Sequence, residues 1–160
     1  MPAIHQNLIS GVDGREGGLD AAALAAMLAA PAARQHLVFV AGASAHTGRG
    51  AVGDLHLELA DPDVLNQLMG RERRLLGDQA PLLRVEADSV ADGLRGAAVR
   101  CEADLAVVGA SRRAGIPHMT RDEDALAVIH HTAETVAIAP VGFAERPHRM
   151  ESVEIGRALV

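Results

Sequence analysis

Residues 103–140, from Ala103-Asp104-Leu105-Ala106-Val107-Val108-Gly109 to Thr135-Val136-Ala137-Ile138-Ala139-Pro140, decide the fold. The first apolar run is too short for a helix and ends at a glycine, which is typical of a buried parallel strand that runs into a turn. A helix is predicted to begin near Thr120 and to lead into the second apolar run, a strand that ends at Pro140. The stretch therefore predicts a β-α-β unit with its functional loop between strand and helix.

The rest of the chain supplies more elements of the same kind. Apolar runs predict strands over 7–12, 36–41 and 81–86, and apolar spacing predicts helices over 19–30, 61–76 and 89–101. Strands that alternate with helices imply an α/β fold, a three-layer α/β/α sandwich around a five-stranded, mostly parallel sheet. Ligands bind beyond the carboxyl ends of such strands, so Asp13, the loop after Ala41 and the loop after Val108 should converge.

Three local features refine the helices. Pro31 is expected to stop the helix over 19–30. The helix over 61–76 carries an apolar stripe that includes Leu75 and that only Glu72 interrupts. In the helix over 89–101, which Ser89 is expected to cap, Gly93 and Gly96 weaken the helix but allow close packing.

Composition excludes several classes of function. The 15 basic residues are all arginine, and 21 acidic residues give a net charge of -6, which argues against a nucleic-acid surface. Without lysine there is neither a P-loop nor a Schiff-base lysine. Cys101 is the only cysteine, and no apolar segment is long enough for a membrane span, so we expect a cytoplasmic protein with no membrane partner.

Two segments resemble the universal stress protein family: Val12-Asp13-Gly14, and Val108-Gly109-Ala110-Ser111-Arg112-Arg113-Ala114-Gly115. The resemblance covers about residues 5–144. It implies the adenine nucleotide alpha hydrolase-like sandwich with strand order 3-2-1-4-5. It also implies a nucleotide pocket, whose equivalents in this sequence are Val12, Asp13, Val40, Gly109, Arg112, Gly115, Asp122 and Glu123.

The family's motif is only partly kept. Nucleotide-binding members carry Gly-x-x-Gly, nine residues, and then Gly-Ser or Gly-Thr. Here the second glycine falls on Arg112, and the final pair falls on Asp122-Glu123, so that only Asp13 and Gly109 match. Acids at a helix N-terminus occupy the place where free amides and the helix dipole would otherwise hold a phosphate.

Thr120-Arg121-Asp122-Glu123 also fits a capping box, in which threonine and glutamate satisfy each other's backbone amides. The sequence therefore predicts a pocket filled by its own side chains. Two roles stay open. Asp13 either contacts adenine or only forms the Asp-Gly turn. Arg112 and Arg113 either clamp phosphates or belong to a solvated turn or an ion pair with Asp122 or Glu123.

The resemblance then implies a non-catalytic, dimeric stress-response module with a degraded adenine-nucleotide site, with no metal and no cofactor. The alternative is an ATP-binding protein that uses Mg²⁺ and hydrolyses slowly. A hydrolase that uses Ser44 or Ser111 is a third class, and it requires a histidine close to one of these serines.

The chain divides into a domain over 1–144 and an extension over 145–160, which is either a tail, a strand exchanged with a partner, or the start of a second domain. The strand over 135–140 lies at a sheet edge in the family's order. An exposed apolar edge pairs readily with a copy of itself, so we expect a homodimer through this strand. An unidentified protein partner or small ligand is the remaining expectation.

Overall fold

The computed structural model describes residues 5–41, 63, 66–67, 69–77, 80–110 and 135–146. These residues form strands, helices and one 3-10 helix, in the order β1 (His5–Gly11), α1 (Glu16–Leu28), β2 (Ala29–Ala41), α4 (Gly70–Leu76), β3 (Leu82–Glu86), α5 (Val90–Cys101), β4 (Leu105–Gly109), β5 (Thr135–Ala139) and η2 (Phe143–Glu145).

The five strands form one sheet in the order β3-β2-β1-β4-β5, and every pairing is parallel. The predicted sheet and strand order are therefore confirmed, and the described sheet is wholly rather than mostly parallel. β4 is an interior strand, in which Leu105 pairs with Leu8 of β1 on one side and with Thr135 of β5 on the other. Because such a strand is covered on both faces, its residues are apolar without alternation.

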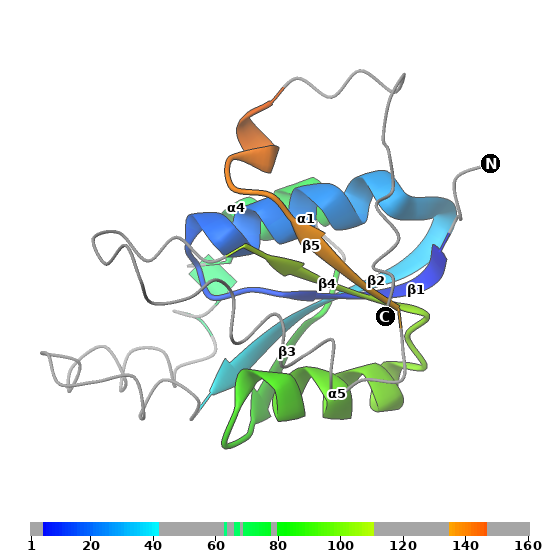
Figure 1. Cartoon of the computed structure of the whole chain (residues 1–160), viewed down its shortest axis with the longest axis vertical. Helices are drawn as coiled ribbons and strands as arrows, with labels where there is room; N and C mark the ends of the chain where they lie inside the picture. The colour runs from blue at the N-terminus through cyan, green and yellow to red at the C-terminus, as the bar shows by residue number, and fades with distance from the viewer. Residues whose placement is uncertain are drawn as a thin grey trace, which may run out of the picture.

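Helices cover both faces of the sheet, with α1 and α4 above it and α5 below it in the view of Figure 1. Neighbouring strand residues alternate between the two layers: Leu8 packs with α1 and Ile9 packs with α5. On the lower face, α5 contributes Leu94 and a row of alanines to a cluster with strand residues such as Val38. The architecture is the three-layer α/β/α sandwich that the sequence predicts.

The prediction that Pro31 ends the first helix is wrong. The helix α1 ends at Leu28, and β2 begins at Ala29, so Pro31 lies inside the strand. The register of β2 on β1 shifts between the pairs His5–Ala29 and Asn7–Arg34, and Pro31 falls within that irregularity. A proline, which lacks an N–H group, is tolerated where the regular ladder is interrupted.

Two other local predictions are wrong. Leu75 was expected on the apolar stripe of its helix, but it is 42% exposed. Gly96 was expected to allow close packing, but a Cβ atom there would have no neighbour within 4 Å. The same prediction is confirmed for Gly93, where a Cβ atom would lie 2.6 Å from the methyl groups of Val40.

The helix over 61–76 is described only in part, since its predicted start at Asp61 lies outside the described residues. Its predicted end is confirmed: α4 ends at Leu76, and Gly77 follows with φ of 98°, in a region that favours glycine. None of the helices in the described ranges is long and apolar enough to cross a membrane.

Candidate functional site

The carboxyl ends of β1 and β4 lie next to each other, and the start of α1 lies against both. A Cβ atom on Gly18 would lie 3.0 Å from Cα of Val12, and a Cβ atom on Gly109 would collide with the backbone of Gly17. The structure therefore brings Asp13 and Gly109 to one place, as predicted. We call this region, built from residues 11–18 and 109–110, the carboxyl-edge site.

Asp13 is exposed and stabilises the turn between β1 and α1. Its Oδ1 atom accepts a hydrogen bond of 3.0 Å from the backbone N–H of Arg15, and Gly14 between them has φ of 76°. This is the turn-forming interaction expected of Asp-Gly. This hydrogen bond uses Oδ1 and not Oδ2 of Asp13. Contact of Asp13 with an adenine or a ribose stays a prediction.

The side chains of Val12 and Val40 belong to the hydrophobic core. The side chain of Val12 is 5% exposed and packs in a cluster with Leu37 and Met69. The side chain of Val40 lies under α5, against Gly93. Both side chains are used in packing, and contact of either residue with a nucleotide stays a prediction.

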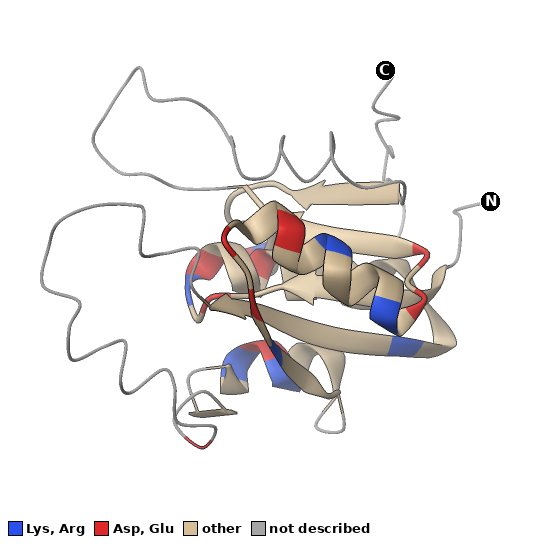
Figure 2. Ribbon diagram, turned by 90° about the horizontal axis from the view of Figure 1, so that it is seen from below, with Lys and Arg blue, Asp and Glu red and all other residues tan. Residues whose placement is uncertain are grey.

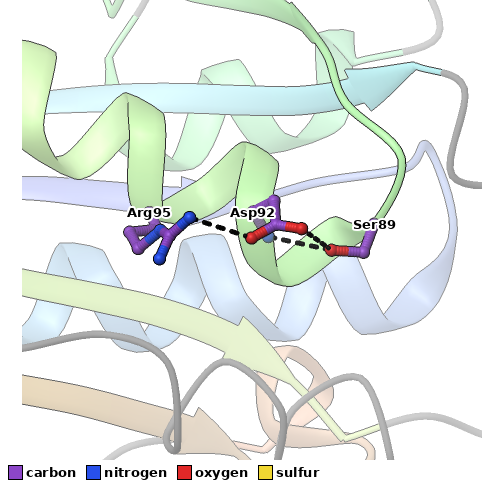
Figure 3. Close-up of polar contacts among 3 residues, drawn as sticks. All are labelled: Ser89, Asp92 and Arg95. Atoms are coloured by element: carbon purple, nitrogen blue, oxygen red, sulfur yellow. Dashed lines mark hydrogen bonds and ion pairs between the residues drawn. The ribbon is translucent and has the colours of Figure 1, made fainter.

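The N-terminus of α5 lies at the same edge of the sheet, and its own side chains cap it (Figure 3). The Oγ atom of Ser89 accepts a 3.1 Å hydrogen bond from the N–H of Asp92 and donates one of 2.8 Å to the carboxylate of Asp92. Arg95 donates to the other carboxylate oxygen at 3.1 Å. The cap predicted at Ser89 is confirmed, and this helix start already holds a negative charge.

Acidic side chains follow the strand ends along this edge. Asp13 comes after β1, Glu86 ends β3, and Asp88 follows it, while Glu16 is the first residue of α1. The red segments on the left of Figure 2 lie at this end of the sheet. Arg15 is the basic residue next to Glu16, so the local charge is mixed but mainly negative.

Glu72 adds a buried carboxyl group near this edge. It lies in α4, is 2% exposed, and its Oε2 atom has no hydrogen-bond partner among the described residues. Burial raises its pKa, and the nearby negative charge of Asp13 raises it further, against lowering by its backbone hydrogen bond and by Arg71. Glu72, which interrupts the apolar stripe of its helix, is therefore a buried ionisable residue of α4.

The other predicted pocket residues, Arg112, Gly115, Asp122 and Glu123, lie outside the described residues. So do Thr120 and Arg113, Ser44 and Ser111, and the loop after Ala41. Within the described ranges, no group of three or more His, Cys, Asp or Glu side chains is arranged to hold a metal ion.

Sequence reasoning missed the role of Asp20. This aspartate lies in α1, is 3% exposed, and accepts hydrogen bonds from the N–H groups of Gly142 at 2.9 Å and Ala144 at 2.8 Å. It thereby fixes η2 and the end of the described chain against α1. Its only signal in the sequence is a single charge at the start of the alanine-rich run that follows Leu19.

Solved structures that superpose on this chain include universal stress proteins. A universal stress protein from Lactobacillus plantarum is 19% identical and superposes with a TM-score of 0.60, covering 86% of this chain and 99% of its own. A universal stress protein in complex with cAMP is 19% identical with a TM-score of 0.59, covering 86% and 98%. A member of that family from Burkholderia pseudomallei is 26% identical with a TM-score of 0.52, covering 83% and 94%.

The similarity of this chain to known proteins lies in its structure more than in its sequence. No protein-family model and no curated protein sequence matches the chain. The structural likeness extends over nearly the full length of each neighbour, so the chain has the fold of those proteins.

Proposed function

With the universal stress protein fold as the premise, we propose that this chain is a non-catalytic regulatory module whose adenine-nucleotide site no longer holds a triphosphate. The observation that carries the proposal is the presence of acidic residues at the helix N-termini along the carboxyl edge. Both described ones, in α1 and α5, have an acid in the first turn.

Phosphates bind helix N-termini because free N–H groups and the positive end of the dipole face them. In α5 the amide of Asp92 is bonded to Ser89, and the carboxylate of Asp92 already interacts with the dipole. In α1 the amide of the N-cap residue Arg15 is bonded to Asp13, no side chain caps the first turn, and Glu16 supplies the acid there. The capping box that the sequence predicts at Thr120 would place an acid at a further helix start.

Electrostatics favours the same conclusion. A triphosphate would bring several negative charges to an edge that already carries Asp13 and Asp88, while Glu86 is paired with Arg84. Like charges a few ångströms apart repel, by about 1 kcal/mol per pair in water and by more where water is partly excluded. A nucleoside or a nucleotide with fewer charges meets less of this repulsion.

The alternative is a functional ATP-binding protein, and two observations favour it. Asp13 and Gly109, the family residues that this sequence keeps, lie together, and a structural neighbour carries cAMP. In that alternative, Arg112 and Arg113 replace the missing glycine amides as phosphate ligands, and hydrolysis, if present, is slow.

Thermal unfolding with nucleotides separates the two functions. Millimolar ATP with Mg²⁺ is expected to leave the melting temperature unchanged. A ligand at about 100 times its Kd would stabilise the fold by ~2.7 kcal/mol, or roughly 5–10 °C for a chain of this size. A shift of that size that disappears in Asp13→Ala, but persists in the control Glu145→Gln, would refute the degraded site. The same samples with AMP and adenosine test whether a ligand with less charge binds.

The proposed module is cytoplasmic and a homodimer that pairs through β5. The support is the position of β5 at one end of the strand order and its uncharged sequence. Light scattering over a range of concentrations should give twice the monomer mass, and Thr135→Lys, which places a charge on an exposed edge position, should weaken the association. A monomer at every concentration would remove this part of the proposal.

A further inference from the structure

An open surface pocket of about 470 Å³ lies at the opposite end of the sheet from the carboxyl-edge site. It is formed where the last turn of α5 passes over Arg34 and His36 of β2 and Leu83 of β3. Because α5 runs opposite to the strands, its C-terminus returns to the end where they begin (Figure 1). We call this surface pocket the amino-edge pocket.

Two arginines, Arg34 and Arg100, line the amino-edge pocket. Both residues are exposed, and neither has an ion pair or hydrogen bond to any residue in the described part of the chain. The other arginines of the lower layer differ: Arg84 is paired with Glu86, and Arg95 is paired with Asp92. The N–H donors of the Arg34 and Arg100 guanidinium groups therefore have no acceptor among the described side chains.

His36 adds a third polar residue, and this one is half-buried. Its Nδ1 atom has almost no exposed surface and no hydrogen-bond partner among the described residues. His36 therefore contributes part of the pocket wall, and its Nδ1 atom is not a donor that a ligand reaches in this conformation.

One negative charge opposes these groups. Glu102 also lines the pocket, in a left-handed conformation with φ of 51° just after α5. Its backbone N–H caps the helix by bonding to the carbonyls of Ala98 and Val99, which reduces the negative potential of the helix C-terminus. Two guanidinium charges still exceed one exposed carboxylate, so the pocket favours an anion.

The remaining walls are apolar. Leu83 and Pro81 line one side, and Val99, which is 67% exposed, lines another. Cys101 completes the lining, and burial raises the pKa of its thiol, although Arg100 opposes the shift, so it acts as a neutral apolar surface rather than a nucleophile. A ligand that fits has a charged head and an apolar body.

We propose that the amino-edge pocket binds a small organic carboxylate, with the carboxylate between Arg34 and Arg100 and the apolar chain along Leu83 and Val99. The volume falls in the range of small-molecule sites, roughly 300–1,000 Å³. This site is independent of the proposed function, because it shares no residue with the carboxyl-edge site.

The test is a ¹H–¹⁵N NMR titration of the full chain with hexanoate, with hexanol as the uncharged probe. Hexanoate is expected to shift the amide signals of residues 34–36 and 99–102 in a saturable manner, and hexanol is expected to bind much more weakly. Arg34→Gln and Arg100→Gln should each raise the Kd for hexanoate about tenfold, the loss of one charge-assisted contact.

Arg95→Gln is the matched control, since Arg95 lies in the same helix but pairs with Asp92 at its other end. It should leave the Kd unchanged, and the spectra themselves report whether each variant is folded. The proposal is overturned if hexanoate shifts no amide, if hexanol binds equally well, if the shifts are confined to residues 12–17 and 109–110, or if Arg95→Gln weakens binding as much as Arg100→Gln does.

Discussion

Replacing Asp20 with alanine should destabilise the protein more than any change at an exposed acid. The carboxylate of Asp20 is 3% exposed and receives two backbone N–H groups, those of Gly142 and Ala144, at 2.9 and 2.8 Å. Asp20→Ala removes both acceptors and separates η2 from α1. Asp20→Asn keeps one carbonyl oxygen, so it can still accept from one of the two groups.

The magnitude follows from the two bonds. A hydrogen bond to a charged group contributes about 1.5–3 kcal/mol net when buried. Gly142 and Ala144 are half-buried rather than buried, so that water replaces part of the loss. We therefore expect Asp20→Ala to lower the free energy of unfolding by about 2–4 kcal/mol and Asp20→Asn by about 1–2 kcal/mol, which lowers the melting temperature by roughly 5–15 °C for the alanine variant.

Urea unfolding followed by far-ultraviolet circular dichroism measures these changes, because the chain has no tryptophan or tyrosine for fluorescence. Glu145→Gln is the control, since it removes an exposed carboxylate from η2 itself and should change stability by less than about 0.5 kcal/mol. The reasoning fails if Asp20→Ala unfolds at the same urea concentration as Glu145→Gln, or if Asp20→Asn is as unstable as Asp20→Ala.

Three further changes test the packing and the caps by the same urea assay. Gly96→Ala should stabilise the protein by about 0.4–1 kcal/mol, since the new methyl group has no neighbouring atom. Gly93→Ala should destabilise it by about 1–2 kcal/mol, because the new methyl group overlaps Val40. Equal effects of the two substitutions would contradict this packing. Ser89→Ala removes the cap of α5 and should lower the free energy of unfolding by about 1 kcal/mol. An unchanged free energy of unfolding would show that this cap does not contribute to stability. Glu72→Gln tests the raised pKa. A carboxyl whose pKa is higher in the folded state than its usual 4.5 loses stability as pH rises above that value. Glu72→Gln should therefore gain stability relative to the unchanged protein from pH 4 to pH 7, and parallel pH profiles would exclude a buried ionisable group.

The sequence alone predicted the sheet because its strands are buried on both faces. β4 is the clearest case: Leu105 to Val108 are all buried, so the strand is an unbroken apolar run that cannot be mistaken for an amphipathic helix. The order of the strands came from the family resemblance rather than from any one segment. The convergence of Asp13 and Gly109 followed from the parallel sheet, because both residues lie where such strands end.

The failures occur where a residue's role depends on a distant partner. Asp20 bonds to backbone groups 122 and 124 residues away, which no local pattern encodes. The irregular register that places Pro31 inside β2 depends on pairing with β1. Gly93 and Gly96 are alike in the sequence, and only Val40, on another element, makes the first a packing site and the second an open position.

The two outermost strands of the sheet differ in a way that limits how copies of the protein can associate. β3 carries Arg84 and Glu86, a charged pair 2.9 Å apart, whereas β5 carries no charge over Thr135–Ala139. Charges discourage the addition of another strand, so of the two borders of the described sheet the β5 border is the one that favours growth. Two copies joined there by a two-fold axis would form a continuous ten-stranded sheet with a charged β3 margin at each end. We therefore expect association to stop at two chains and not to continue into fibres.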